Sequence, residues 1–280
     1  MKFSIITPSF RSSKWLKLCI PSVADQNVDL EHIIQDACSD DGTQEWLPKE
    51  TRVKAFIEKD AGMYDAVNRG LRRASGDVLA YLNCDEQYLP GALSQVAGYF
   101  SQHPEVDVVF GDAVVVGPDG NYLCHRRALL PTRIHTLVSG TMSILSCAMF
   151  FRRRVVEQQN LFFDTRYRDL GDGHWVLTAL ERQLAMGLLP NFTSAFTNTG
   201  ENMNFKPNAV RERKELFASA PAWARAFRLG FIVQYRMRKL LAGHYWQAPF
   251  DYAIYTSANP QKRAGFHVAK PTAVWVDVQP

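Results

Sequence analysis

Short β-rich runs alternate with amphipathic helical stretches through the first 115 residues of this 280-residue chain. Five runs rich in β-branched and aromatic residues have the length of strands: 2–7, 31–35, 53–57, 78–82 and 106–110. Between them, apolar residues recur every three or four positions, as in Met63, Val67 and Leu71, which is the spacing of a helix. This succession predicts an α/β fold with a Rossmann-like, mostly parallel central sheet flanked by helices on both faces.

Polar residues follow each of the first four predicted strands. Ligands of such sheets bind outside the carboxyl ends of the strands. The residues found there are Pro8 and Ser9, then Asp36, then Glu58 and Asp60, and finally Asn83, Asp85 and Glu86. Oxygen ligands in a short loop suit Mg²⁺ or Mn²⁺, with a diphosphate completing the coordination. The alternative is a polar turn in front of the helix that begins near Pro90.

Composition excludes several classes of protein. A formal net charge of +4 gives no reason to expect nucleic-acid binding. No stretch approaches the roughly 18 consecutive apolar residues of a membrane-spanning helix, and the first residues lack a secretion signal. The five cysteines are widely spaced without a CxxC pair, which favours a reducing cytoplasm. Neither a G-x-G-x-x-G loop nor a P-loop motif is present, which disfavours dinucleotide dehydrogenases and P-loop enzymes.

The pattern changes after Asp112. Residues 113–116 and 122–125, joined by the turn GPDGN, predict a β-hairpin, and 172–186 and 221–241 predict helices. From Lys206 to Tyr245 there are nine Lys or Arg residues against two Glu. We therefore expect a first domain over 1–205 and a basic, helical C-terminal extension over 206–280.

The predicted helix 221–241 is amphipathic. Its apolar side comprises Trp223, Phe227, Phe231, Met237, Leu240 and Leu241, opposite several arginines. Such a helix could make peripheral contact with an anionic membrane surface, or its stripe could pack on the first domain with the arginines in solvent.

The run EKDAGMYDAVNRGLRRASGDVLAYLNCDE, from Glu58 to Glu86, resembles the family 2 inverting glycosyltransferases of the GT-A fold, particularly bacterial members that build surface polysaccharides. The shared positions include Asp60, Gly62, Tyr64, Asp65, Ala66, Asn68, Gly70, Gly76, Asp77, Leu82, Asn83 and Asp85. Upstream, SIITPSF and QDACSDDGT are similar to the family's first strand and its acidic loop. This chain departs from the pattern at Cys84, at Glu86, and at Ser146 where relatives often carry a histidine.

The resemblance implies transfer of a sugar, with inversion, from a nucleotide-sugar donor to an acceptor hydroxyl in bacterial polysaccharide or glycolipid synthesis. A UDP-sugar is the favoured donor, and the acceptor is a glycan or a lipid-linked molecule. It also implies the residues that bind the donor and its metal: Thr7, Pro8, Ser9, Asp36, Asp60 and Asn83 for the nucleotide, and Asp85 for Mn²⁺ or Mg²⁺. The protein would act in the cytoplasm, with a possible peripheral position on the inner face of the cytoplasmic membrane.

The general base is sought in FDTRYRDLGDGHWVLTAL, Phe163 to Leu180, where Asp172 aligns with the first acid of a family motif. Inverting transfer needs such a group to take the proton from the acceptor hydroxyl. His174 is the second candidate, as base or as a ligand of the diphosphate. Asp172 could instead be only a helix N-cap. A nucleotidyltransferase and a non-catalytic nucleotide-sugar binder are the remaining alternatives.

Overall fold

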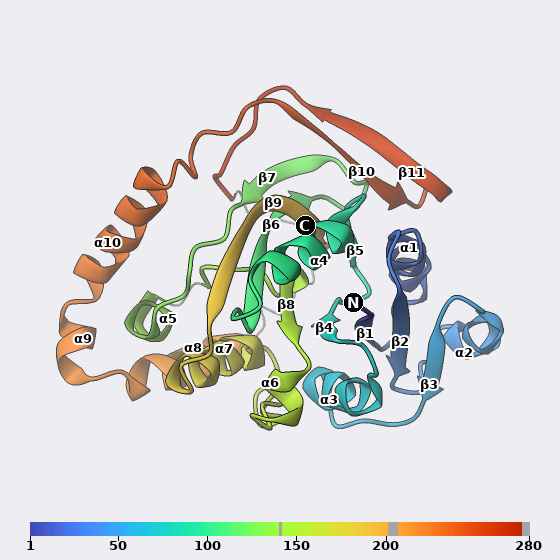
Figure 1. The fold of residues 1–280 in the computed structure, drawn as a ribbon, viewed down its shortest axis with the longest axis horizontal. Coiled ribbons are helices and arrows are strands. Elements are labelled where there is room, and N and C mark those ends of the chain that lie inside the picture. Colours follow the sequence, from blue (N-terminus) through green and yellow to red (C-terminus); the bar gives the residue numbers. More distant parts are fainter. Residues whose placement is uncertain (140–141, 201–206, 276–280) are drawn as a thin grey trace.

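The computed structural model describes residues 1–139, 142–200 and 207–275. Its centre is a sheet with the strand order β3-β2-β1-β4-β8-β6-β9-β5, in which β7 pairs with β6 (Figure 1). The strands are β1 (Phe3–Ser9), β2 (Leu30–Asp36), β3 (Lys54–Ile57), β4 (Val78–Tyr81), β5 (Glu86–Tyr88), β6 (Val108–Val116), β7 (Tyr122–Arg126), β8 (Met149–Arg152) and β9 (Met186–Thr197).

The sheet is mostly parallel, as predicted. β3, β2, β1 and β4 are parallel neighbours, and β6 and β9 form another parallel pair. Between these groups, β8 runs antiparallel to both β4 and β6, while β5 and β7 are antiparallel partners of β9 and β6. The predicted fifth strand is longer than 106–110, because β6 continues through Val116 into the predicted hairpin with β7.

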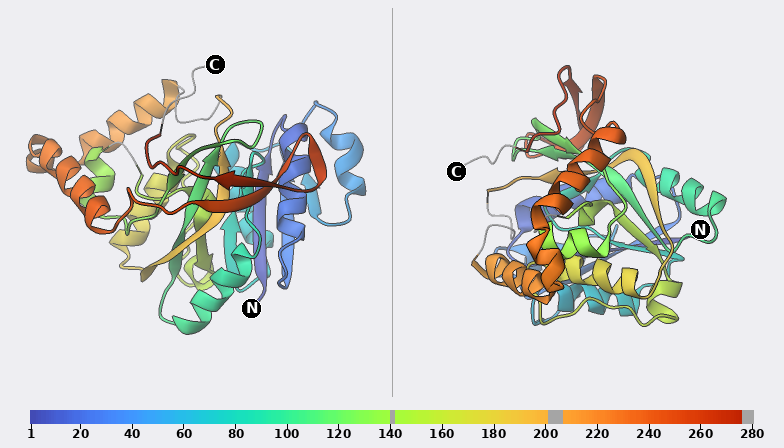
Figure 2. Two further views of the ribbon diagram at one scale, coloured as in Figure 1. Left: turned by 90° about the horizontal axis from the view of Figure 1, so that it is seen from above. Right: turned by 90° about the vertical axis from the view of Figure 1, so that its left-hand side faces the viewer.

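Helices cover both faces of the sheet (Figures 1 and 2). Successive residues of β1 point to opposite faces, so that Ile5 packs with α1 and α4, and Ile6 with α3 and α7. The helices are α1 (Ser13–Ala24), α2 (Thr43–Trp46), η1 (Leu47–Lys49), α3 (Met63–Arg73), α4 (Ala92–Gln102), α5 (Arg133–Ser139), η2 (Ser146–Ala148), α6 (Arg154–Glu157), α7 (Gly171–Glu181), α8 (Pro207–Ser219), α9 (Ala222–Ala226) and α10 (Arg228–Leu241).

Two predicted helices have different bounds. Helix α7 ends at Glu181, not Met186, because the chain turns through Gln183, with a φ of 56°, and Met186 begins β9. The stretch 221–241 is two helices, because Phe227, with a ψ of 20°, separates α9 from α10. None of the helices in the described ranges combines the length and apolar character that crossing a bilayer requires.

The C-terminal extension is helical through α10, as expected, but then forms a β-hairpin that the sequence analysis did not predict. Strands β10 (Phe250–Thr256) and β11 (Asn259–Val268) are antiparallel, and Tyr252 and Ile254 pack with Val114 and Val116 of β6. The Arg263 guanidinium donates to both carboxylate oxygens of Asp25 at 2.6 Å and fastens the hairpin to the end of α1. The expected boundary at 205/206 falls outside the described residues.

Helix α3 packs closely on β1 because Gly70 has no side chain. A Cβ placed on Gly70 would overlap the side chain of Ile6, which is fully buried. This close approach fixes the distance between α3 and the strand whose carboxyl end carries Pro8 and Ser9.

We predict that Gly70→Ala destabilises the fold, because the added methyl must displace Ile6. Overpacking of a core typically costs about 1–3 kcal/mol. The matched control is Gly98→Ala on the exposed side of α4, where a Cβ meets no atom within 4 Å; it should stabilise by up to about 1 kcal/mol through helix propensity. Thermal unfolding measures both, and equal melting temperatures would contradict the packing argument.

Candidate active site

A cleft of about 1300 Å³ opens at the carboxyl ends of β1, β2 and β4. This is the edge of the sheet at which the sequence predicts ligand binding. The cleft brings together six of the predicted site residues: Pro8, Ser9, Asp60, Asn83, Asp85 and Asp172.

Thr7 and Asp36 are not among the residues that line the cleft. The buried hydroxyl of Thr7 lies 2.9 Å from His32 Nε2. The buried carboxylate of Asp36 accepts hydrogen bonds from the hydroxyls of Ser9 at 2.9 Å and Ser39 at 2.7 Å. Both side chains therefore lie behind the residues that line the cleft. Asp36 accepts a hydrogen bond from Ser9, and Ser9 does line the cleft.

Two adjacent carboxylates follow β4: Asp85 lies in the turn between β4 and β5, and Glu86 is the first residue of β5. Glu86 is 1% exposed, and its Oε2 accepts from the backbone N–H of Asn83 at 2.8 Å. Its other oxygen, Oε1, is buried without a hydrogen-bond partner. Burial raises the pKa of both carboxyls, and that of Glu86 is raised further by the charge on Asp85. No ion pair within the described ranges compensates either charge.

This turn suits a divalent cation that is held partly by the protein and partly by the phosphates of a bound substrate. The described residues contain no cluster of three or more His, Cys, Asp or Glu that could hold a metal alone. Mg²⁺ and similar ions commonly bind through one or two carboxylates together with substrate phosphates. An uncompensated carboxylate at the cleft wall and an unpartnered buried oxygen beside it fit that type of site.

Asp172 faces the cleft from the other side, in the first turn of α7. Its Oδ1 accepts from the N–H of Gly173 at 2.7 Å, and its own N–H donates to the Tyr64 hydroxyl at 3.1 Å. Burial raises the pKa of Asp172 to about 6. The N-cap residue of α7 is Leu170, so the alternative reading of Asp172 as the N-cap is wrong.

His174 does not line the cleft. Its ring stacks on Tyr167, with 3.4 Å between ring centroids, and its Nε2 is buried without a hydrogen-bond partner. Burial lowers the pKa of His174. A base role for His174 would therefore require its ring to leave Tyr167.

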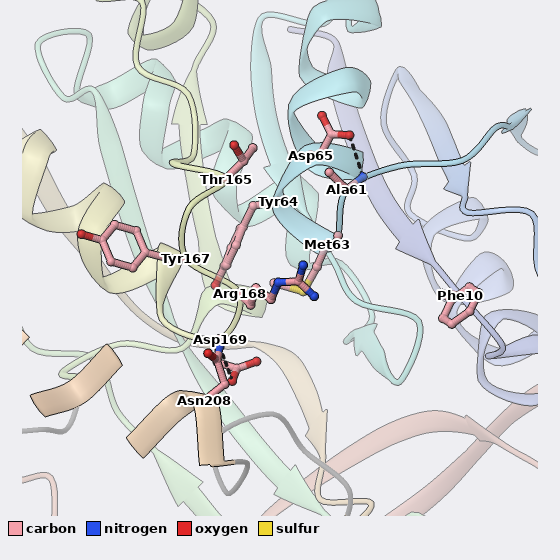
Figure 3. A pocket seen from close by; sticks show the side chains of 11 residues that line it. Phe10, Ala61, Met63, Tyr64, Asp65, Thr165, Tyr167, Arg168, Asp169 and Asn208 are labelled. Carbon is pink, nitrogen blue, oxygen red and sulfur yellow. Dashed lines mark hydrogen bonds between the residues drawn. The ribbon is translucent and has the colours of Figure 1, made fainter. Parts of the chain in front are cut away.

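The segment before α7 contributes site residues that the sequence analysis missed. Arg168 and Asp169 line the cleft and also a smaller adjoining cavity of about 410 Å³. Figure 3 shows Arg168, Asp169 and Tyr64 around that cavity, with Asn208 of α8 donating to Asp169 Oδ2 at 3.1 Å. The only sequence signal was the density of charged residues in TRYRDLGD; the partner from α8 lies 39 residues away.

Solved structures with the same fold confirm the GT-A architecture. S. aureus TarS 1–349 in complex with UDP-GlcNAc aligns with a TM-score of 0.62 and 19% identity, covering 86% of this chain and 73% of that one. Mannosyltransferase PcManGT from Pyrobaculum calidifontis, in complex with GDP-Man and Mn²⁺, aligns with a TM-score of 0.53 and 15% identity, covering 86% and 79%.

Curated relatives match over shorter stretches. A PGL/p-HBAD biosynthesis glycosyltransferase of Mycobacterium tuberculosis is 33% identical over 120 residues, 40% of this chain and 47% of the relative. A GalNAc(5)-diNAcBac-PP-undecaprenol beta-1,3-glucosyltransferase of Campylobacter jejuni is 35% identical over 100 residues, 33% of this chain and 32% of the relative. The chain thus matches less than half the length of these relatives.

The family model described as Glycosyl transferase family 2 matches residues 4–160, which is more than half of the chain and includes the carboxyl end of β1 and the turn that carries Asp85. Together with the fold and the carboxylates of the cleft, this match shows that the chain belongs to glycosyl transferase family 2.

Proposed function

We propose that this protein is a metal-dependent glycosyltransferase that moves a sugar, with inversion, from a UDP-sugar to an acceptor hydroxyl in bacterial polysaccharide or glycolipid synthesis. The observation that carries the proposal is that Asp85 and Asp172 line one cleft from different elements. A transferase needs a group for the leaving diphosphate and another for the attacking hydroxyl. Family membership and the UDP-GlcNAc named with the TarS structure support the donor class.

The donor would lie along the ends of β1 and β4. Asp85 would hold Mn²⁺ or Mg²⁺, and a bound ion would neutralise the charge that develops on the departing diphosphate. Asn83 and Asp60, which both line the cleft, offer an amide and a carboxylate to the nucleotide. Asp36 would act through Ser9, because its carboxylate accepts a hydrogen bond from the Ser9 hydroxyl.

Asp172 would act as the general base. Its carboxylate is held by the N–H of Gly173 and lies at the cleft wall. With a pKa of about 6 it is ionised at neutral pH, yet more basic than an ordinary aspartate. The acceptor hydroxyl would lose its proton to Asp172 as its oxygen attacks the anomeric carbon opposite the leaving group, which inverts that centre.

We predict that Asp85→Asn lowers affinity for UDP in the presence of Mn²⁺ by at least about 100-fold, because a charged ligand of the ion is lost. Donor hydrolysis with Mn²⁺ should fall to background. The control Asp29→Asn lies in the exposed loop before β2, at the opposite end of the strand, and should bind like the wild type. Calorimetry with UDP and Mn²⁺ measures this affinity. An unchanged UDP affinity in Asp85→Asn would show that Asp85 does not bind the metal.

We predict that transfer is lost as pH falls through about 6, where Asp172 takes up a proton. Transfer at saturating donor and Mn²⁺ should be about tenfold slower at pH 5 than at pH 7, whereas an ordinary aspartate would keep it fast down to about pH 4. Asp172→Asn should lower kcat by at least about 100-fold and keep UDP affinity. An active Asp172→Asn protein would show that another group is the base.

The acceptor would be a glycan or a lipid-linked molecule that the enzyme meets at the inner face of the cytoplasmic membrane. Of the six apolar residues predicted on one side of 221–241, only Phe231 is half-buried; Trp223, Phe227, Met237, Leu240 and Leu241 are exposed. Leu229 and Val233 extend this exposed surface, which Arg225 and Arg236 flank. Exposed apolar side chains with basic neighbours are typical of a helix lying on anionic lipid.

We predict that the protein pellets with vesicles containing anionic lipid and much less with neutral vesicles. Replacing Leu229, Val233 and Leu241 by Ser should weaken binding at least about tenfold, because each side chain loses burial in the lipid. Val274→Ser, at another exposed apolar position, is the control. If the triple variant pellets like the wild type, α10 is not the membrane contact.

A further inference from the structure

Glu212, in helix α8 of the C-terminal extension, is a buried carboxylate bonded to the backbone of the loop that leads into α7. It is 1% exposed. Its Oε1 accepts from the N–H of Arg168 at 2.8 Å, and its Oε2 accepts from the N–H groups of Asp169 at 3.1 Å and Leu170 at 2.8 Å. Asn208, one turn earlier in α8, also donates to Oε1 at 2.8 Å.

These bonds satisfy backbone donors of the loop that precedes α7, the last of which belongs to its N-cap residue, Leu170. The first N–H groups of a helix have no partner within the helix, and a nearby side chain usually accepts from one of them. The N-cap residue of α7, Leu170, has no side chain that can do so. Burial alone would raise the pKa of Glu212, but the amide donors hold this pKa below its ordinary range. The carboxylate therefore stays ionised, and its negative charge interacts favourably with the positive end of the α7 dipole.

The loop that Glu212 holds forms part of the cleft wall. Arg168 and Asp169 line the cleft, and Asp172 follows the last bonded amide, that of Leu170, by two residues. A further contact at the start of α7 is made by the Tyr64 hydroxyl, which accepts from the N–H of Asp172. Gly171 lies so close that a Cβ there would come within 2.5 Å of the Tyr64 ring.

We propose that Glu212 is a positioning residue for the transfer reaction: it fixes the backbone of 168–170 and thereby the direction in which Asp172 meets the acceptor. This inference rests on the proposed role of Asp172 as base. It makes the C-terminal extension a part of the active site, although the matched family segment ends at residue 160.

Glu212→Gln tests this with little change in volume. The amide has one oxygen where the carboxylate has two, so its NH₂ group must face backbone N–H donors, and the loop must shift. A displacement of about 1 Å at a catalytic group can cost 100-fold in rate. We therefore expect kcat for transfer to fall about 100-fold, with the donor KM and the UDP affinity in Mn²⁺ within twofold of the wild type, because the nucleotide side of the cleft is untouched.

The matched control is Glu215→Gln, three residues later in the same helix. Glu215 is exposed and pairs only with Arg211, at 3.7 Å, among the described residues. It should keep the wild-type kcat. Asn208→Ala removes the amide donor shared by Glu212 and the side chain of Asp169, but leaves the three backbone amide bonds to Glu212, so it should lower kcat by less than Glu212→Gln does. This milder variant decides the question if Glu212→Gln does not fold.

The outcomes separate this inference from the proposed function. If Asp172→Asn transfers sugar at the wild-type rate, Asp172 is not the base, whatever the rate measured for Glu212→Gln. If Asp172→Asn is inactive but Glu212→Gln transfers like Glu215→Gln, the positioning role is wrong. A loss of UDP affinity in Glu212→Gln that matches its loss of kcat would also overturn it, since that pattern means a general disruption of the fold.

Discussion

Two carboxylates held largely out of water at the end of β4 impose the main constraint on this molecule. Removing an unpaired charge from water costs several kcal/mol even after the protein relaxes. Elsewhere the fold compensates such charges: Glu31 is bonded by Lys54, Ser4 and Ser75, and Glu212 by backbone amides. At Asp85 and Glu86 the described residues supply no cation. The balance must come from bound protons or from a bound ion, and a cleft at this turn gives an ion and its diphosphate room.

The cleft is built from two walls of different origin. One wall is formed by the sheet itself. Because β1 and β4 are parallel neighbours, their carboxyl ends, with Ser9 and Asn83, lie side by side. The opposite wall, which carries Asp172, depends on contacts across the chain. Tyr64 of α3 accepts from the backbone of Asp172, and α8 holds the loop before it. Donor binding and the proposed proton transfer are thus assigned to parts of the fold that different mutations can perturb separately.

The same distinction explains what the sequence could predict. The parallel strands β1 to β4, helix α3 and the cleft edge follow from periodicities and motifs that lie within about 90 consecutive residues. The hairpin β10–β11 depends on packing against β6, more than 100 residues earlier, and no local pattern marks that partner. Asp36 illustrates a limit at the site itself: the sequence places it at a strand end, but whether its carboxylate faces the cleft or Ser9 is decided by its neighbours in space.

Two residues of the C-terminal extension, Glu212 and Leu241, reverse the usual order of burial. Within 30 residues the extension buries a glutamate at 1% exposure and leaves Leu241 at 83% exposure, although glutamate is among the residues least often buried and leucine among those most often. For a protein that folds in water, neither the burial of a glutamate nor the exposure of a leucine is favourable by itself. The glutamate is explained by the amide donors that it meets in the loop before α7. The exposed leucine, with its apolar and basic neighbours, fits the membrane contact proposed for α10. On the proposed function the extension would have two separate roles: Glu212 would position the loop before α7, and α10 would contact the membrane at which a lipid-linked acceptor is met.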